Sequence, residues 1–335
     1  MRIQKAMLFG ARDLRFVEEE IEGARPGAGE VVVTAEVTAL STGTDLGNYE
    51  GRSTEVPGAP DYPRPVGYSH VGTVTAAGEG AGWSVGDRVF SMRPHQSAYL
   101  AGAGDLLVRV PEGADRDGAS LAYLTQLGMA GMRQARYEAG ERVAVVGLGV
   151  IGLCTVAVAV AMGARVTAIG NSAFRNALAT TMGAGVTLAS GDGALAGLDA
   201  DLVVLTANPW AAYRDAVAAA RYGGRISILG FPGRAQAPPE FNPLDASWLY
   251  AKQLTLLGSG YSPRTEAGPH EVAFNLRRNL ELIFDYMCAG RLPLERIITH
   301  RMPWHSMRDA YELALGRSKE MAAAVFDWSV GAGRS

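Results

Sequence analysis

Cysteine is scarce in this sequence: only Cys154 and Cys288 occur among 335 residues. Two cysteines exclude a disulfide framework and a cysteine-rich zinc site, and both are expected to be buried or half-buried thiols within helices in a reducing compartment. Charged residues are also few, at 19%, and the formal net charge is only −3. This balance gives no reason to expect nucleic acid or an anionic membrane as a partner.

No secretory signal precedes the strand-like residues 1–5, so we expect a cytoplasmic protein. Apolar residues make up 48% of the chain, which is typical of a globular enzyme, and the length predicts two domains. The apolar run 143–169 is long enough to span a membrane. Its embedded glycines and Arg165 instead favour a strand, a turn, a helix and a second strand, and we expect no membrane span.

That run contains a glycine motif. Residues 143–146 predict a strand buried on both faces, and Gly147, Gly149 and Gly152 follow at G-x-G-x-x-G spacing before an apolar helix. The first glycine permits a tight turn, the second lets the backbone approach a pyrophosphate, and the third lets helix and strand pack closely. The amides that open the helix face the anion. The predicted pyrophosphate site consists of Gly147, Gly149, Val150, Ile151 and Gly152.

No acidic residue occurs between Val143 and Gly191. A protein that prefers NAD usually places Asp or Glu about 20 residues after the glycines, where it accepts hydrogen bonds from the ribose. That place is taken here by Gly170, which leaves room for a 2′-phosphate, and Asn171, Ser172 and Arg175 follow as donors. The sequence therefore favours NADP(H), although Arg175 is also compatible with a solvated place on the next helix.

The pattern of predicted strands and helices differs between the two parts of the chain. Residues 1–111 form short β-runs broken by Gly and Pro, which predicts a small closed β-domain. From Gly118 onward, helices and apolar strands alternate, which predicts an α/β domain with a doubly wound parallel sheet. A helix over 274–289 and a further strand and helix over 297–315 are expected to follow. The predicted strands lie at 143–146, 166–169, around 186, 202–205, 226–229, 254–257 and 323–326.

The order of these segments, together with several short motifs, resembles the medium-chain dehydrogenase/reductase superfamily over essentially the whole chain. The motifs are Thr42-Gly-Thr-Asp-Leu46, Gly67-Tyr-Ser69, Val85-Gly-Asp-Arg-Val89, Ile297-Ile-Thr-His300 and Asp309-Ala-Tyr-Glu312. The first two are most similar to the bacteriochlorophyllide dehydrogenase-like branch and to related biosynthetic reductases. The resemblance implies a GroES-like β-barrel catalytic domain over 1–118, a Rossmann NADP(H)-binding domain over 119–258, and a return segment over 259–335. It also implies an active site in the cleft between the domains, and a homodimer or homotetramer.

Zinc-dependent members of this family bind a catalytic metal with cysteine and histidine. The resemblance places Thr42, Tyr68, Ser69 and Tyr123 at the matching positions, and hydroxyl groups are poor zinc ligands. We therefore expect no metal. The remaining candidates His70, His95 and His300 form no ligand cluster in the sequence and are expected to be hydrogen-bonded structural residues.

Without a metal, the charge that develops during hydride transfer must be met by a donated hydrogen bond or a proton. The resemblance places hydroxyl groups where the metal would be held and where the family's proton relay begins, but the relay histidine falls at Gly47. Buried tyrosines also commonly do no more than pack. The candidate catalytic residues are Tyr68, Thr44, Tyr123, Thr42 and Asp45.

Several further residues are assigned by resemblance. Lys319, with Arg317, stands where a late basic residue approaches the cofactor phosphates, although both also suit a solvated helix end. Residues 258–260 are expected at a dimer-forming edge strand or in the cleft. Trp248 and Tyr250 either line the substrate pocket or bury area beside the sheet. The expected contacts to the nicotinamide end are Thr206, Asn208, Gly230 and Phe231.

These observations predict a zinc-independent, NADP(H)-dependent oxidoreductase. It is expected to move hydride between the nicotinamide and a carbonyl, alcohol or imine of a small biosynthetic intermediate. An enoyl or quinone reductase is the enzymatic alternative. A dinucleotide-binding sensor or structural subunit without turnover is also compatible with the glycine motif.

Overall fold

The computed structural model describes residues 1–21, 25–52, 61–262, 274–316, 318 and 320–330. Internal contacts divide the chain into two units, one of residues 1–123 with 298–335 and one of residues 124–297. The return to the first unit thus comes later than the expected residue 259. The reason is that the 3₁₀ helix η3 (Leu294–Ile297) still packs against α4 (Val150–Ala161) and α5 (Ala173–Thr181) of the second unit.

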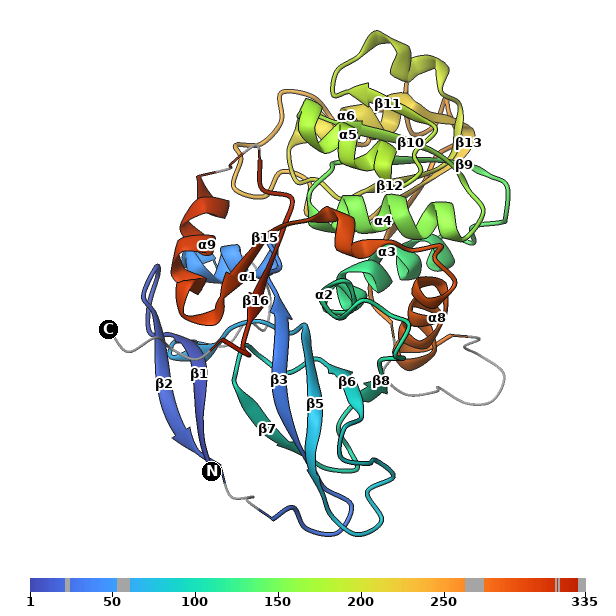
Figure 1. Cartoon of the computed structure of the whole chain (residues 1–335). Coiled ribbons are helices and arrows are strands. Elements are labelled where there is room, and N and C mark those ends of the chain that lie inside the picture. Colours follow the sequence, from blue (N-terminus) through green and yellow to red (C-terminus); the bar gives the residue numbers. More distant parts are fainter. Residues whose placement is uncertain (22–24, 53–60, 263–273, 317, 319, 331–335) are drawn as a thin grey trace. The chain divides into compact units, whose positions relative to one another are not determined.

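The first unit is built mainly from short strands (Figure 1). A seven-stranded sheet has the order β15-β16-β3-β5-β6-β8, with β7 also paired to β3, and a three-stranded sheet has the order β2-β1-β4. An isolated bridge joins Lys5 of β1 to Gln96, which lies shortly before β7. The strands are β1 Arg2–Leu8, β2 Leu14–Glu20, β3 Val31–Ala39, β4 Arg64–Pro65, β5 His70–Ala77, β6 Arg88–Ser91, β7 Ala98–Ala101, β8 Leu107–Arg109, β15 Ile298–Pro303 and β16 Ala323–Asp327.

Helices close one side of the first unit's core. α9 (Met307–Leu315) follows the short 3₁₀ helix η4 (Trp304–Ser306) and contacts α1 (Thr44–Tyr49). Tyr311 of α9 packs on Tyr49 of α1 with ring centroids 5.0 Å apart, and both rings are buried. β15, α9 and β16 confirm the strand, the helix and the final strand that were expected after residue 297. α2 (Arg116–Ala119) precedes α3 (Ala122–Gln134), which leads into the second unit.

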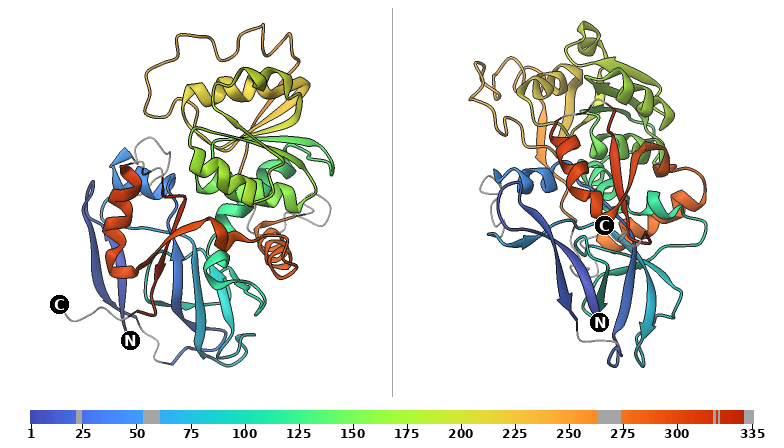
Figure 2. Two further views of the ribbon diagram at one scale, coloured as in Figure 1. Left: turned by 45° about the horizontal axis from the view of Figure 1, so that its top comes forward. Right: turned by 60° about the vertical axis from the view of Figure 1, so that its left-hand side comes forward.

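The second unit contains the predicted parallel sheet, with strand order β11-β10-β9-β12-β13-β14. β9 pairs in parallel with both β10 and β12, and helices pack on both faces of the sheet, so Val143–Val146 are all buried, which explains this continuous apolar run. α4 and α5 cover one face of the sheet and α6 the other (Figure 2). The strands and helices are β9 Arg142–Val146, β10 Arg165–Gly170, β11 Val186–Ala189, η2 Gly193–Gly197, β12 Ala200–Leu205, α6 Trp210–Ala219, β13 Ala220–Ile228, β14 Thr255–Gly258 and α8 Leu276–Cys288.

The two thiols differ in exposure. Cys154 is buried in α4, as expected, but Cys288 is exposed at the end of α8, so the prediction for Cys288 was wrong. The α8 helix is amphipathic, and Cys288 stands next to Met287 on the solvent side of its last turn. None of the helices in the described part of the chain combines the length and apolar character needed to span a membrane.

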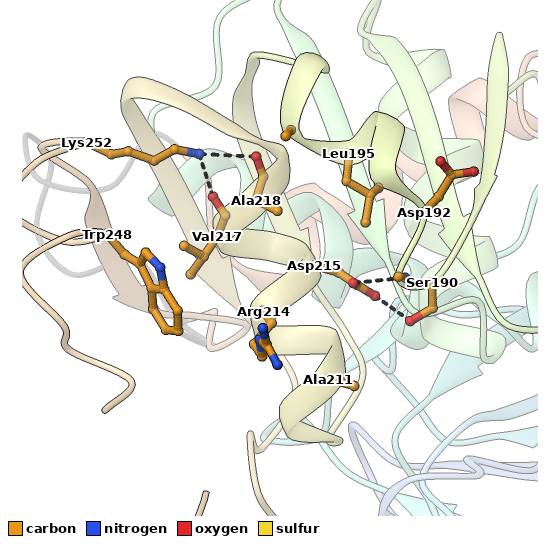
Figure 3. Close-up of a pocket in the computed structure, with 12 residues that line it drawn as sticks. Ser190, Asp192, Leu195, Ala211, Arg214, Asp215, Val217, Ala218, Trp248 and Lys252 are labelled. Atoms are coloured by element: carbon orange, nitrogen blue, oxygen red, sulfur yellow. Dashed lines mark hydrogen bonds between the residues drawn. The ribbon is translucent and has the colours of Figure 1, made fainter. Parts of the chain in front are cut away.

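The C-terminal end of α6 is capped by a lysine. Lys252 Nζ donates to the carbonyl oxygens of Val217, Ala218 and Ala220 at 2.9, 3.1 and 2.8 Å, and Figure 3 shows the ammonium directed at the first two. A cation at this end of a helix satisfies carbonyls that have no partner inside the helix and also interacts favourably with the helix dipole.

Replacing this lysine tests the cap. Lys252→Met keeps an apolar stem but leaves the three carbonyls without their donor, so the free energy of unfolding should fall by about 1–2 kcal/mol. The measurement is urea unfolding followed by tryptophan fluorescence. The matched control is Lys5→Met, which removes only a surface ion pair with Glu19 and should cost less than about 1 kcal/mol. Equal effects of the two substitutions would contradict a specific role for Lys252.

Candidate functional site

The predicted glycine turn follows β9 in the second unit. Gly147 has φ +96°, and a Cβ built on Gly152 would lie 1.8 Å from the carbonyl oxygen of Gly147. Only glycine at position 152 permits this approach of α4 to the strand end. Gly149 is the N-cap of α4, and its hypothetical Cβ meets nothing within 4 Å. Open space therefore lies beside the N-cap of α4, and no side chain among the described residues caps this end of the helix, as an anion site requires.

The ends of β12 and β13 lie beside this turn. The Thr206 hydroxyl donates to the carbonyl of Gly147 at 2.7 Å, and Asn208 Oδ1 accepts from the backbone N–H of Phe231 at 2.9 Å. A Cβ on Gly230 would lie 2.8 Å from the carbonyl oxygen of Ala207. The structure thus brings Thr206, Asn208, Gly230 and Phe231 to the same carboxyl edge as the glycines. This edge includes the switch point of the strand order, where open α/β sheets bind their ligands.

At the end of β10 the expectation for Gly170 needs correction. Gly170 is buried, and the space beside its Cα is filled by Leu148 and Asn176 rather than left open for a phosphate. The next two residues are accessible to solvent: Asn171 is exposed and Ser172 is half-buried. Ser172 is the N-cap of α5, but its side chain makes no capping bond.

Of the three cations predicted for this site, the structure describes only Arg175. Arg175 lies in the first turn of α5, half-buried, and burial lowers the pKa of its guanidinium. Lys319 and Arg317 fall outside the described residues. Gly258 is the last residue of the edge strand β14 and residues 259–260 follow it; the hydroxyl of Ser259 bonds that of Ser227 at 2.6 Å.

A cavity of about 660 Å³ lies along α6 (Figure 3). Its buried carboxylate, Asp215, accepts from the Ser190 hydroxyl and from the N–H of Gly191. Trp248 lines the cavity and packs on Phe241 with centroids 5.4 Å apart. Trp248 is half-buried and packs against the core beside the sheet, which was one of the two roles foreseen for it. Tyr250 is 76% exposed, so it does not bury area beside the sheet.

In the first unit the structure brings Tyr68 and Tyr123 together. Their ring centroids are 5.3 Å apart at an interplanar angle of 79°. The Tyr68 hydroxyl donates to Ser41 Oγ, and the Ser69 hydroxyl donates to the carbonyl of Ser120. Burial, and after it the charge of Asp45, raises the pKa of Tyr68 above its ordinary value, so the phenol remains protonated at neutral pH.

Asp45 connects the two segments that carry these hydroxyls. Its carboxylate accepts from the N–H of Ser41 at 2.9 Å and from the N–H of Gly67 at 3.2 Å. The side chain is buried, and burial raises the pKa of Asp45 to about 7, although both bonds act in the opposite direction. Asp45 therefore holds the backbone around Tyr68. Of the other predicted hydroxyls, Thr44 is exposed and Thr42 is half-buried.

Gly67, which precedes Tyr68, is constrained by a histidine. It has φ +86°, and a Cβ built on it would lie 2.5 Å from the ring of His95. His95 Nδ1 bonds Thr38 Oγ1 at 2.8 Å, and burial lowers the pKa of His95 to about 3, so the ring is neutral. His70 is also buried and bonds the carbonyl of Gln96 at 3.2 Å.

His300 completes the set of histidines proposed as alternatives, and its Nδ1 bonds Thr299 Oγ1 at 2.9 Å. All three thus make the structural hydrogen bonds that we expected. Among the described residues, no three His, Cys, Asp or Glu side chains come close enough together to bind a metal ion.

The sequence analysis did not identify two residues that lie near Tyr68 and Asp45. Ser41 precedes the Thr42 motif, and nothing in its local pattern indicates that it bonds a phenol 27 residues away. Tyr311 lies far along the chain in α9. Its buried hydroxyl has no hydrogen-bond partner among the described residues, and burial followed by the charge of Asp45 raises the pKa of Tyr311. Only the packing of α9 on α1 brings it near Asp45.

Two family models match the chain. Residues 27–119 match the alcohol dehydrogenase GroES-like domain, and residues 150–273 match the zinc-binding dehydrogenase model. The first match confirms the expected GroES-like domain, and the second begins at α4, directly after the glycine turn, and covers the strands β10 to β14 of the parallel sheet.

Curated relatives are dehydrogenases. A probable zinc-binding alcohol dehydrogenase of Mycobacterium tuberculosis is 28% identical, over 95% of this chain and 87% of its own. L-galactonate-5-dehydrogenase of Escherichia coli is 27% identical, over 64% of this chain and 60% of its own. The 2-desacetyl-2-hydroxyethyl bacteriochlorophyllide A dehydrogenase of Cereibacter sphaeroides is 37% identical, over 27% of each chain. The chain thus spans less than two thirds of the last two proteins.

Solved structures share the fold. A zinc-binding dehydrogenase of Sinorhizobium meliloti bound to NADP has a TM-score of 0.77 at 19% identity and covers 98% of this chain and 99% of its own. An alcohol dehydrogenase of Escherichia coli in complex with NADH has a TM-score of 0.77 at 20% identity, and the match covers 97% of this chain and 99% of that protein.

The bridge made by Asp45 predicts a pH dependence of stability. Between the ordinary aspartate pKa and about 7, the folded protein keeps a proton that the unfolded chain has lost, so stability is present at low pH and is lost as the pH rises towards 7. Between pH 5 and 8 the wild type should therefore lose about 2 kcal/mol of unfolding free energy relative to Asp45→Asn. Urea unfolding at several pH values measures this difference.

The matched control for that experiment is Asp309→Asn, which neutralises an exposed carboxylate on α9. Its stability should change with pH as that of the wild type does. Parallel curves for the wild type and Asp45→Asn would show that Asp45 does not titrate in this range.

Proposed function

Because this chain belongs to the medium-chain dehydrogenase/reductase superfamily, we propose that it is a zinc-independent, NADP(H)-dependent oxidoreductase. Its general class, an NAD(P)-dependent oxidoreductase of the dehydrogenase type, follows from the family. The proposed reaction moves hydride between the nicotinamide and a carbonyl, alcohol or imine of a small biosynthetic intermediate. The observation that carries this proposal is the pair Tyr68 and Tyr123, packed together at two positions matching the family's metal ligands.

The residues of the second unit fit a dinucleotide. Gly147, Gly149 and Gly152 would hold the pyrophosphate against the start of α4, where no side chain competes for the amides. Ser172 and Arg175, at the start of α5, supply a free capping position and a cation suited to a 2′-phosphate. The structural relatives include one bound to NADP and one bound to NADH, so NADP(H) rests on these local donors and on the lack of an acidic residue at position 170.

The residues of the first unit do not fit zinc. A tetrahedral site needs thiolate, imidazole or carboxylate ligands, but the matching positions carry Thr42, Tyr68, Ser69 and Tyr123. The hydroxyls of Tyr68 and Ser69 already donate to Ser41 and to the Ser120 carbonyl. The nearest carboxylate, Asp45, is held by two backbone amides. These bonds support chemistry without a metal.

Bound nicotinamide would supply or accept the hydride. Hydride arriving at a carbonyl or imine carbon leaves negative charge on the heteroatom, and that charge requires a donor. The phenol of Tyr68 remains protonated at neutral pH and can donate in this role once its single O–H turns from Ser41 Oγ to the substrate. It also interacts with the hydroxyl of Thr44, which is exposed and connects the phenol with solvent protons. Ser41 and Asp45 keep the phenol and its backbone in place.

Removing one hydroxyl tests this role. Tyr68→Phe should lower kcat for a ketone or imine by about 100-fold or more, because the developing charge loses its donor, while the Kd for NADPH stays unchanged. The measurement is NADPH oxidation with a ketone, an imine and a conjugated enone. The matched control is Tyr99→Phe, since Tyr99 is a buried tyrosine of the same unit that donates to Ser91 Oγ at 2.7 Å. Its rate should stay near that of the wild type.

Two outcomes would redirect the proposal. Turnover of the enone alone would indicate an enoyl reductase. Binding of NADPH without consumption across the whole panel would indicate a sensor.

Metal removal tests the zinc-independent chemistry. Active protein should contain zinc well below one atom per chain, and exhaustive dialysis against a chelator should leave kcat unchanged, because the hydroxyls at the family's ligand positions bind zinc poorly. Elemental analysis and steady-state assays before and after dialysis measure both quantities. Stoichiometric zinc, or a reversible loss of turnover on chelation, would contradict the proposal.

A further inference from the structure

We propose that Leu148 and Asn176 act together to restrict position 170, the specificity-determining position at the end of β10, to glycine, because they fill the space beside it and so leave no room for an acidic side chain. This inference rests on the proposed preference for NADP(H) and gives it a structural cause. In folds of this type, an acidic side chain at that place binds the ribose hydroxyls of NAD, and its charge opposes a 2′-phosphate.

The space beside Gly170 is occupied from two directions. A Cβ built on Gly170 would lie 2.5 Å from Asn176 Oδ1, 2.7 Å from Leu148 Cδ1 and 3.0 Å from Leu148 Cγ. The first two distances are shorter than any ordinary contact of a Cβ, so even alanine at position 170 requires both neighbours to move.

Neither neighbour is free to move without cost. Leu148 is 4% exposed and belongs to the glycine turn itself, between Gly147 and Gly149. Moving its side chain would disturb the same turn that is proposed to hold the pyrophosphate. The site for the phosphates and the site for the ribose are thus coupled through one leucine.

Asn176 is held by α5 and by β11. Its Nδ2 donates to the carbonyl of Leu188 at 3.3 Å, and its backbone N–H donates to the carbonyl of Ser172 at 2.9 Å. Its Oδ1 is buried, has no hydrogen-bond partner among the described residues, and is directed at Gly170. A carboxylate introduced at position 170 would therefore meet a partial negative charge as well as a steric clash.

The strand end is also held within the sheet. Gly170 pairs with Ala189 of β11, and its carbonyl accepts from the N–H of Ser190 at 3.1 Å. Asn171 and Ser172 follow and are accessible, so donors to a 2′-phosphate remain available. The arrangement blocks an acidic residue at position 170 and leaves these donors in place.

The test compares substitutions at position 170 in two backgrounds, the wild type and Leu148→Ala/Asn176→Ala. Kd values for NADPH and NADH come from cofactor fluorescence, and folding is measured by the unfolding midpoint. In the wild-type background, Gly170→Asp should weaken binding of both cofactors by about tenfold or more and lower the midpoint by about 4 °C or more. In the truncated background, the same substitution should leave the midpoint near that of its parent and favour NADH over NADPH by about tenfold.

Two control substitutions separate the effect of added side-chain volume at position 170 from the effect of a negative charge. Gly170→Ala adds only a methyl group and should lower the midpoint in the wild-type background but not in the truncated one. Because this comparison needs no charged variant, it remains decisive if Gly170→Asp fails to fold. Asn171→Asp places a carboxylate on the neighbouring exposed residue and should weaken NADPH binding without lowering the midpoint.

The failures are distinguishable. A wild type that binds NADH as tightly as NADPH would overturn the proposed cofactor preference. Gly170→Asp or Gly170→Ala that folds as stably as the wild type in both backgrounds would overturn the roles of Leu148 and Asn176, whatever the cofactor preference.

Discussion

The second unit depends on the close approach of α4 to the end of β9. Gly152 lies so near the carbonyl of Gly147 that no side chain fits between them, and the hydroxyl of Thr206 bonds the same carbonyl from β12. One peptide group therefore joins a helix and two strands. The opening amides of α4 are oriented by this contact, and a dinucleotide site at this edge requires them to be free. The conformation of a single turn thus determines whether the sheet has an anion site.

The first unit uses a buried carboxylate for a similar purpose. Asp45 accepts amides from Ser41 and Gly67, and these two segments carry the phenol of Tyr68 and its hydroxyl partner. On the other side, His95 leaves no space for a side chain on Gly67. A buried carboxylate is costly in solvation, as its raised pKa shows. The fold tolerates that cost at a position where it fixes the geometry of two backbone segments.

Local patterns predicted the parts of this molecule that depend on local chemistry. The glycine spacing and the apolar run of Val143–Val146 were enough to predict the turn, the strand and the helix. The effect of Gly170 was not predictable, because its neighbours Leu148 and Asn176 come from the preceding turn and the following helix, and only their side-chain packing shows that the space is filled. Ser41 lies 27 residues from Tyr68 and Gly67 lies 22 residues from Asp45, so strand pairing and not local spacing brings these partners together.

The unequal exposure of the two thiols has a practical consequence. Cys154 is enclosed in α4, and burial raises its pKa to about 12, whereas Cys288 is exposed at the end of α8. Because the thiolate is the reactive form, a maleimide dye should label Cys288 and leave Cys154 unmodified. The native sequence therefore already offers a single attachment point for fluorescence work, and no engineered cysteine is required.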